Sequence, residues 1–208
     1  MNEVIPPQFT DTSCRSHLED HMTPHRLAKT LASSYPLDRP IVYVCIGTDR
    51  STGDSLGPLT GSLLEKRKLP FFDLYGTLKD PVHALNLADT AEKIRMEYDN
   101  AFVVAIDACL GQFRNIGYIE VGEGPIFPGA GVQKQLPPIG DVHITGIVNA
   151  GGFMEHAMLQ NTRLYLVNEM ASKITDAIHY SNILLRKTLA KNHTLHTGEQ
   201  LSQSHLQS

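Results

Sequence analysis

Short apolar runs alternate with amphipathic stretches through the middle of the chain. The runs at residues 41–46 and 101–106 are wholly apolar, a pattern typical of strands buried on both faces. Further strands are predicted at residues 71–75, 117–121 and 142–148. Helices are predicted at residues 57–68, 82–98, 152–159 and from residue 161 or 162 to about 189. This alternation predicts an α/β fold in which helices cover both faces of a mostly parallel sheet.

The two ends of the chain differ from this middle part. Residues 1–38 mix polar residues and prolines with one short helical pattern that begins near Pro24, so we expect an N-terminal extension with a short helix. Residues 191–208 are rich in Gln, Ser, His and Thr and predict a disordered polar tail. The remaining residues, 39–190, are predicted to form a single domain.

Composition excludes several classes of protein. The formal net charge of the 208 residues is −4, which disfavours non-specific binding to nucleic acid. No apolar run is long enough for a membrane-spanning helix, and the first residues lack a secretory pattern, so we expect no membrane partner. The 3 cysteines form no C-x-x-C pair, which predicts neither a disulfide framework nor a zinc ribbon and favours a reducing cytoplasm.

Candidate chemistry lies where the predicted strands end, because α/β sheets bind ligands beyond the carboxyl ends of their strands. The loop at residues 47–58 is rich in glycine, but Asp54 stands where a phosphate-binding loop has its lysine. Asp107 directly follows the apolar run at residues 101–106. The first and third strands of such sheets are often neighbours, so we expect Asp54 and Asp107 to meet in one crevice.

Two neighbouring carboxyl groups have more than one use. They repel each other, so one keeps a proton while the other ionises, which suits acid–base hydrolysis and also suits a divalent metal. Structural roles compete: an aspartate before a helix is often an N-cap, and one after a strand is often a turn residue. Asn149, at the end of the strand at 142–148, is placed to donate to a carbonyl or a carboxylate. His156 comes one or two helical turns after the loop that follows this strand, so it can lie near the site. A packed or solvated histidine is nevertheless more common at such a position than a functional one.

Three stretches of the chain resemble the signature stretches of the spore germination endopeptidase, a family that cleaves small acid-soluble spore proteins. They are residues 53–58 (GDSLGP), 105–108 (AIDA) and 128–132 (PGAGV). Over residues 40–188 the chain is similar to the YyaC-type sporulation proteins, which are related to that endopeptidase, and residues 144–149 (ITGIVN) fit that group. The hydrogenase-maturation endopeptidases share the architecture. The resemblance implies a phosphorylase/hydrolase-like three-layer α/β/α sandwich.

The resemblance also implies roles for individual residues. Asp54 and Asp107 match the two aspartates of the germination endopeptidase and would be catalytic. Gly53, Asn149 and the glycines of the loop at residues 122–138, Gly129 and Gly131, would bind the substrate, although this loop also reads as a surface excursion. No resident metal or cofactor is expected. In the hydrogenase-maturation endopeptidases, acidic residues at the positions of Asp54 and Asp107 recognise the nickel ion in the substrate.

Three functions remain open at this point. The leading hypothesis is a cytoplasmic endopeptidase of a spore-forming bacterium, active in the forespore or mother cell on protein or peptide substrates such as small acid-soluble spore proteins. The second is a non-catalytic sporulation factor that binds a peptide or protein partner in the same crevice. A metal-linked maturation peptidase is a minor alternative.

Overall fold

The computed structural model describes residues 13–67, 69–128, 137–152 and 154–204. In this part of the chain six strands form one sheet in the order β1-β5-β6-β4-β2-β3. Their bounds are β1 Cys14–His17, β2 Ile41–Cys45, β3 Phe72–Tyr75, β4 Phe102–Gly111, β5 Tyr118–Glu123 and β6 Val142–Ala150. Strands β3, β2, β4 and β6 are parallel to one another. Strand β5 pairs antiparallel with both β6 and β1, so of these six strands β5 alone runs in the opposite direction. The predicted α/β fold with a mostly parallel sheet is confirmed.

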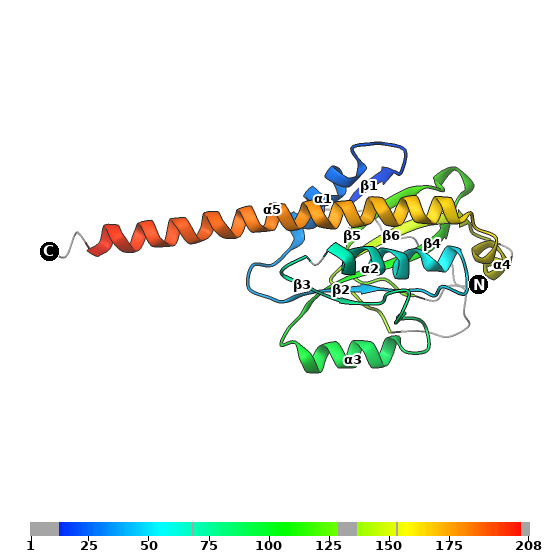
Figure 1. The fold of residues 1–208 in the computed structure, drawn as a ribbon, viewed down its shortest axis with the longest axis horizontal. Helices are drawn as coiled ribbons and strands as arrows, with labels where there is room; N and C mark the ends of the chain where they lie inside the picture. Colours follow the sequence, from blue (N-terminus) through cyan, green and yellow to red (C-terminus); the bar gives the residue numbers. More distant parts are fainter. Residues whose placement is uncertain (1–12, 68, 129–136, 153, 205–208) are drawn as a thin grey trace.

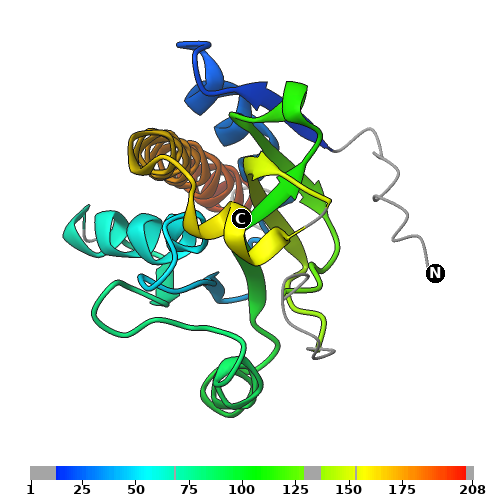
Figure 2. The ribbon, with the colours of Figure 1, turned by 90° about the vertical axis from the view of Figure 1, so that its right-hand side faces the viewer.

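Helices lie on both faces of this sheet. The α-helices are α1 Thr23–Ser34, α2 Leu56–Arg67, α3 Leu87–Glu97, α4 Glu155–Gln160 and α5 Leu164–Ser204, and the 3-10 turns are η1 Gly53–Ser55 and η2 Phe113–Asn115. Helices α1, α2 and α5 gather on one face, and α3 lies on the other (Figures 1 and 2). The molecule is therefore a three-layer α/β/α sandwich. Among the described residues, no helix combines the length and the apolar character needed to cross a membrane.

Strand β2 shows why an uninterrupted apolar run marks the centre of the sheet. Tyr43 and Cys45 pack into the core cluster beneath α1, α2 and α5, whereas Val42 and Val44 pack into the smaller cluster beneath α3. All four side chains are at most 1% exposed. Complete burial of an apolar side chain stabilises the fold by about 1.5–3 kcal/mol relative to exposure, so alternating residues hold both helical layers against the strand.

Strand β4 is longer than the sequence predicts. Its apolar run ends at Ile106, but the strand continues to Gly111 because its parallel pairing with β6, which begins at Val104 opposite Val142, runs on to Gly111 opposite Ala150. Asp107 therefore lies inside the strand rather than directly after it. Strand β2 accompanies β4 only as far as Ile106, so Asp107 is the first residue of β4 beyond the end of its other neighbour.

Both ends of the chain also differ from the sequence prediction. Strand β1 pairs with β5, and α1 places Leu27 and Leu31, fully buried, in the main core. Residues 13–38 thus belong to the same folded unit, since β1 is part of the sheet and α1 covers one face of it, and they do not form a separate extension. At the other end, α5 passes the predicted boundary at residue 190 and continues as a helix to Ser204, projecting beyond the sheet (Figure 1).

Candidate functional site: two carboxyl groups at the end of the sheet

The loop after β2 positions Asp54. A Cβ atom on Gly57 would overlap the carbonyl oxygen of Ile46, so only glycine lets α2 begin this close to the strand. The N–H of Thr48 donates to the Asp54 carbonyl at 3.1 Å and closes the loop. Asp54 lies inside η1, whose N-cap is Thr52, so the helix-capping role that competed at the sequence level is not the one found. The Asp54 side chain is half-buried.

Asp107 occupies a more enclosed place. Its Oδ1 accepts a hydrogen bond from the N–H of Ala108 at 2.8 Å. Part of the residue is accessible, but protein atoms surround the carboxyl group. Burial raises the pKa of Asp107 to about 8, and the negative charge of Asp54 adds to this rise, while the Ala108 hydrogen bond opposes it.

The structure thus brings the two predicted aspartates close enough for their charges to interact. Burial also raises the pKa of Asp54, but the hydroxyl of Ser51 and the charge of His156 lower it. Since Asp107 is the more strongly affected, it holds the proton near neutral pH while Asp54 carries the negative charge. A protonated and an ionised carboxyl group at one site can act as a general acid and a general base.

A polar row extends from Asp107 across the sheet. Asp107 pairs in register with Thr145 of β6, Thr145 pairs with Glu120 of β5, and Glu120 pairs with Arg15 of β1. Residues paired across strands share one face, and Arg15 forms an ion pair with Glu120 at 2.8 Å. Cys109 is partly buried beside this row, and removal of its thiol from water raises the pKa of the thiol to about 12. The thiol therefore stays protonated, which disfavours a role as a nucleophile.

Two of the other predicted substrate-binding residues, Asn149 and Gly53, have structural contacts. The amide nitrogen of Asn149 donates to the carbonyl of Met158 at 2.9 Å and to Thr162 Oγ1 at 3.2 Å, so its N–H groups connect β6 to α4 and to the segment that follows α4. Gly53 is buried against α4, where a Cβ atom would approach Leu159 Cδ2 to 2.8 Å. Gly129 and Gly131 lie outside the described residues.

Two residues, His156 and Ser51, affect the pKa of Asp54, which the sequence does not predict. His156, on α4, is exposed and contacts Gln160 at 3.1 Å, yet its charge acts on Asp54. Ser51 is buried at 5% exposure, and its hydroxyl has no hydrogen-bond partner. The sequence of the loop does not predict that Ser51 is buried, because the conformation of the folded loop determines which hydroxyl groups are buried.

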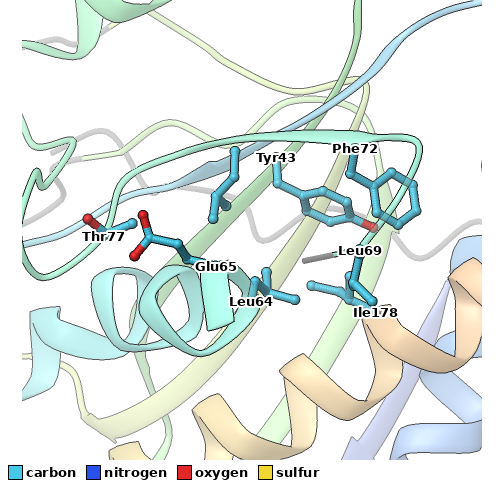
Figure 3. Close-up of a pocket in the computed structure, with 8 residues that line it drawn as sticks. Tyr43, Leu64, Glu65, Leu69, Phe72, Thr77 and Ile178 are labelled. Carbon is cyan, nitrogen blue, oxygen red and sulfur yellow. The ribbon is translucent and has the colours of Figure 1, made fainter. Parts of the chain in front are cut away.

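Within the described parts of the chain, no group of three or more His, Cys, Asp or Glu side chains is placed to hold a metal ion. An apolar cavity of about 180 Å³ lies between α2, strands β2 and β3, and α5, lined by Tyr43, Leu64, Phe72 and Ile178 among others (Figure 3). Neither aspartate lines it, so the cavity is separate from the carboxyl pair.

Comparison with known proteins places the chain in a family. Residues 15–177 match the family described as "Protein of unknown function (DUF1256)". The chain belongs to this family. It is 56% identical over 140 residues, 67% of this chain and 68% of the relative, to the uncharacterized protein YyaC of Bacillus subtilis (strain 168).

A solved structure shares the fold. The NiFe-hydrogenase maturation protease HycI from Thermococcus kodakarensis KOD1 superposes with a TM-score of 0.50 at 20% sequence identity. The superposition covers 75% of this chain and 98% of HycI. At this level of identity the likeness shows the shared α/β architecture alone.

Proposed function

We propose that the protein is an endopeptidase that hydrolyses peptide bonds with Asp54 and Asp107. The observation that carries this proposal is the unequal proton affinity of two neighbouring carboxyl groups: the pKa of Asp107 is raised to about 8, whereas Ser51 and His156 counteract the rise at Asp54. Each group is then in the protonation state that one half of the reaction needs. The shared fold with a maturation protease supports the same reaction class.

The roles follow from the protonation states. Ionised Asp54 accepts a proton from a water molecule as the water oxygen bonds to the carbonyl carbon of the peptide. Protonated Asp107 donates its proton as the C–N bond breaks and the amine leaves. The proton taken up by Asp54 restores Asp107 for the next turnover, so the two aspartates return to their starting states.

The substrate class follows from the signature stretches around Asp54 and Asp107, which resemble those of the germination endopeptidase. We propose protein or peptide substrates of the sporulating cell, with small acid-soluble spore proteins as the first to test. The proposed place of action is the cytoplasm of the forespore or mother cell.

The test is cleavage of purified small acid-soluble spore proteins by the wild type and by two variants, Asp54→Asn and Asp107→Asn. Each variant keeps the shape of the side chain and removes one acid–base group, so we expect each to lower kcat roughly 100-fold or more. Asp49→Asn is the matched control, because Asp49 is exposed in the same loop. Full activity in both site variants would overturn the mechanism.

One observation favours a second candidate, a non-catalytic factor that binds a peptide in the same crevice. Asn149, the side chain expected to hold the scissile carbonyl, donates to Met158 and Thr162 instead. Under this alternative the wild type would bind a spore-protein peptide without cleaving it, and Asp107→Asn would change the affinity. Titration of a labelled peptide with product analysis of the same samples distinguishes binding from hydrolysis.

A further inference from the structure

The edge of the sheet at β3 has backbone groups without a partner strand. Strand β3 comes last in the sheet order, and its residues Phe72–Tyr75 pair in parallel with β2 alone. The N–H and C=O groups on the outer side of β3 therefore have no strand to bond to. Among the described residues, no backbone hydrogen bond from a turn or loop reaches Phe72–Tyr75 either. This edge can accept one more strand.

The apolar cavity of about 180 Å³ lies beside this edge. Phe72 and Leu74, alternate residues of β3, form part of its wall and are half-buried. Tyr43, Leu64 and Ile178, which also line it, are at most 6% exposed. The partly exposed residues mark the mouth, so the cavity opens on the side of β3. A cavity of about 150 Å³ with such a lining accepts benzene, so this one accommodates a phenyl ring or a branched aliphatic side chain.

One end of the cavity is polar. Glu65 and Thr77 lie at this end, and Phe72 lies at the other (Figure 3). The Glu65 side chain is exposed, and no ion pair between described residues includes it. An occupant with a basic side chain near its apolar one would therefore complement the charge of this end.

We propose that the free edge of β3 and the cavity form a docking site for an extended segment of the peptide substrate. The segment adds a strand to β3 and inserts one large apolar side chain into the cavity. A basic residue two positions away lies on the same face of the added strand and meets Glu65. In this mode of recognition the main-chain hydrogen bonds supply affinity and the side-chain pocket supplies specificity.

This inference rests on the proposed function, because it assigns a docking site to that substrate. The position of β3 fits the assignment. Tyr75, the last residue of β3, pairs with Val44 of β2, and β2 leads from there into the loop that carries Asp54. A peptide held at this edge is thus bound close to the end of the sheet where the two aspartates lie.

A second copy of the chain fits this edge less well than a peptide. Two β3 strands paired edge to edge would bring Phe72 and Leu74 of each copy, but these side chains already line the cavity of their own chain. Asp73, exposed between them, would add a like charge from each copy. A separate peptide has neither constraint.

NMR titration with designed peptides tests the docking site without requiring cleavage. The probe is a short threonine-rich peptide with a central phenylalanine and a lysine two positions later. We expect the amide signals of Phe72–Tyr75 to shift, and the same peptide with alanine in place of phenylalanine to bind roughly tenfold more weakly or worse. Unshifted β3 signals, or equal affinity for the two peptides, would overturn the proposal.

Variants of the cavity sharpen this test. Leu74→Trp fills the mouth of the cavity, so the phenylalanine peptide should bind roughly tenfold more weakly. Leu85→Trp is the matched control, because Leu85 is 80% exposed and lies outside the cavity. Unchanged affinity in Leu74→Trp would contradict the proposal, as would a wild-type dimer that Leu74→Trp dissociates, which would make a second copy the occupant.

Glu65→Lys keeps the test decisive if Leu74→Trp does not fold, because Glu65 is exposed. It should weaken binding of the lysine peptide and strengthen binding of a peptide with glutamate at that position. The same affinities as in the wild type for both peptides would show that Glu65 does not face the bound segment and would overturn the proposal.

Cleavage of small acid-soluble spore proteins separates this inference from the proposed function. A docking contact away from the carboxyl pair binds substrate and transition state alike, so Leu74→Trp should raise KM, whereas Asp107→Asn should lower kcat. If the wild type binds the peptide at β3 but cleaves no spore protein, the proposed function fails and the docking site stands. If cleavage requires both aspartates and KM is unchanged in Leu74→Trp, the docking site fails and the proposed function stands.

Discussion

The loop that carries Asp54 and the strand that carries Asp107 give one side chain two different environments. Asp54 is half-buried on a short turn, with a hydroxyl and a histidine that favour its charged form. Asp107 extends from a strand in the middle of the sheet, where protein atoms surround it and one backbone N–H is its hydrogen-bond donor. Burial raises both pKa values, but at Asp54 the Ser51 hydroxyl and the His156 charge act in the opposite direction, whereas at Asp107 only the Ala108 N–H does so.

The difference shows how the fold distributes a proton between chemically identical groups. A loop beyond the end of a strand can bring several polar groups around a carboxylate, whereas a residue within the strand has backbone neighbours that are already paired in the sheet. The ionised group thus comes from the loop and the protonated group from the strand.

The largest expected effect is on the pH dependence of stability. With a pKa near 8 when folded and near 3.8 in the unfolded chain, Asp107 binds more protons in the folded state between these values, so unfolding becomes easier as pH rises through that window. The slope from one such group is at most about 1.4 kcal/mol per pH unit. Asp107→Asn lacks this titration, so it should be more stable than the wild type near pH 8 and lose the advantage towards pH 4.

Urea denaturation of the wild type and Asp107→Asn from pH 4 to pH 8 measures this effect. Asp49→Asn, in the exposed part of the loop, should retain the wild-type slope. A wild-type slope in Asp107→Asn would mean that Asp107 is ionised at neutral pH, and the contrast between the two aspartates would disappear.

A smaller effect is expected from His156, the charge that favours ionisation of Asp54. His156→Gln removes this charge, so the pKa of Asp54 should rise. Because His156 is exposed, salt should screen the interaction, and the difference should shrink between low and high ionic strength. NMR titration of Asp54 at two salt concentrations tests this, and a difference that does not depend on salt would argue for a contact other than charge.

The sequence predicts the fold and the adjacency of the two aspartates because both depend on local signals. The apolar runs that became β2 and β4 identify central parallel strands, and such strands are commonly neighbours, as the register of Val44 opposite Ala105 confirms. The continuation of β4 beyond Ile106 escaped prediction because it depends on pairing with β6, far along the chain. The helical state of residues 191–204 likewise follows from propagation of α5 rather than from local composition.

Within the site, the limits of prediction are set by hydrogen bonds between distant residues. Asn149 is placed correctly at the end of β6, but the sequence does not show that Met158 and Thr162 take its N–H groups. Ser51 is the converse case: no sequence pattern singles it out, yet the fold buries it and leaves its hydroxyl without a hydrogen-bond partner. Sequence patterns thus identify which residues reach the end of the sheet, whereas their remaining hydrogen-bonding capacity depends on the tertiary structure.

The pKa of Asp107, measured by NMR in the wild type and in Asp54→Asn, tests the account most directly. The structure predicts a value of about 8 in the wild type and a lower value in Asp54→Asn, because the variant removes the negative charge that adds to the effect of burial. A value near 3.8 in the wild type, or the same value in both proteins, would show that the two carboxyl groups do not share a site.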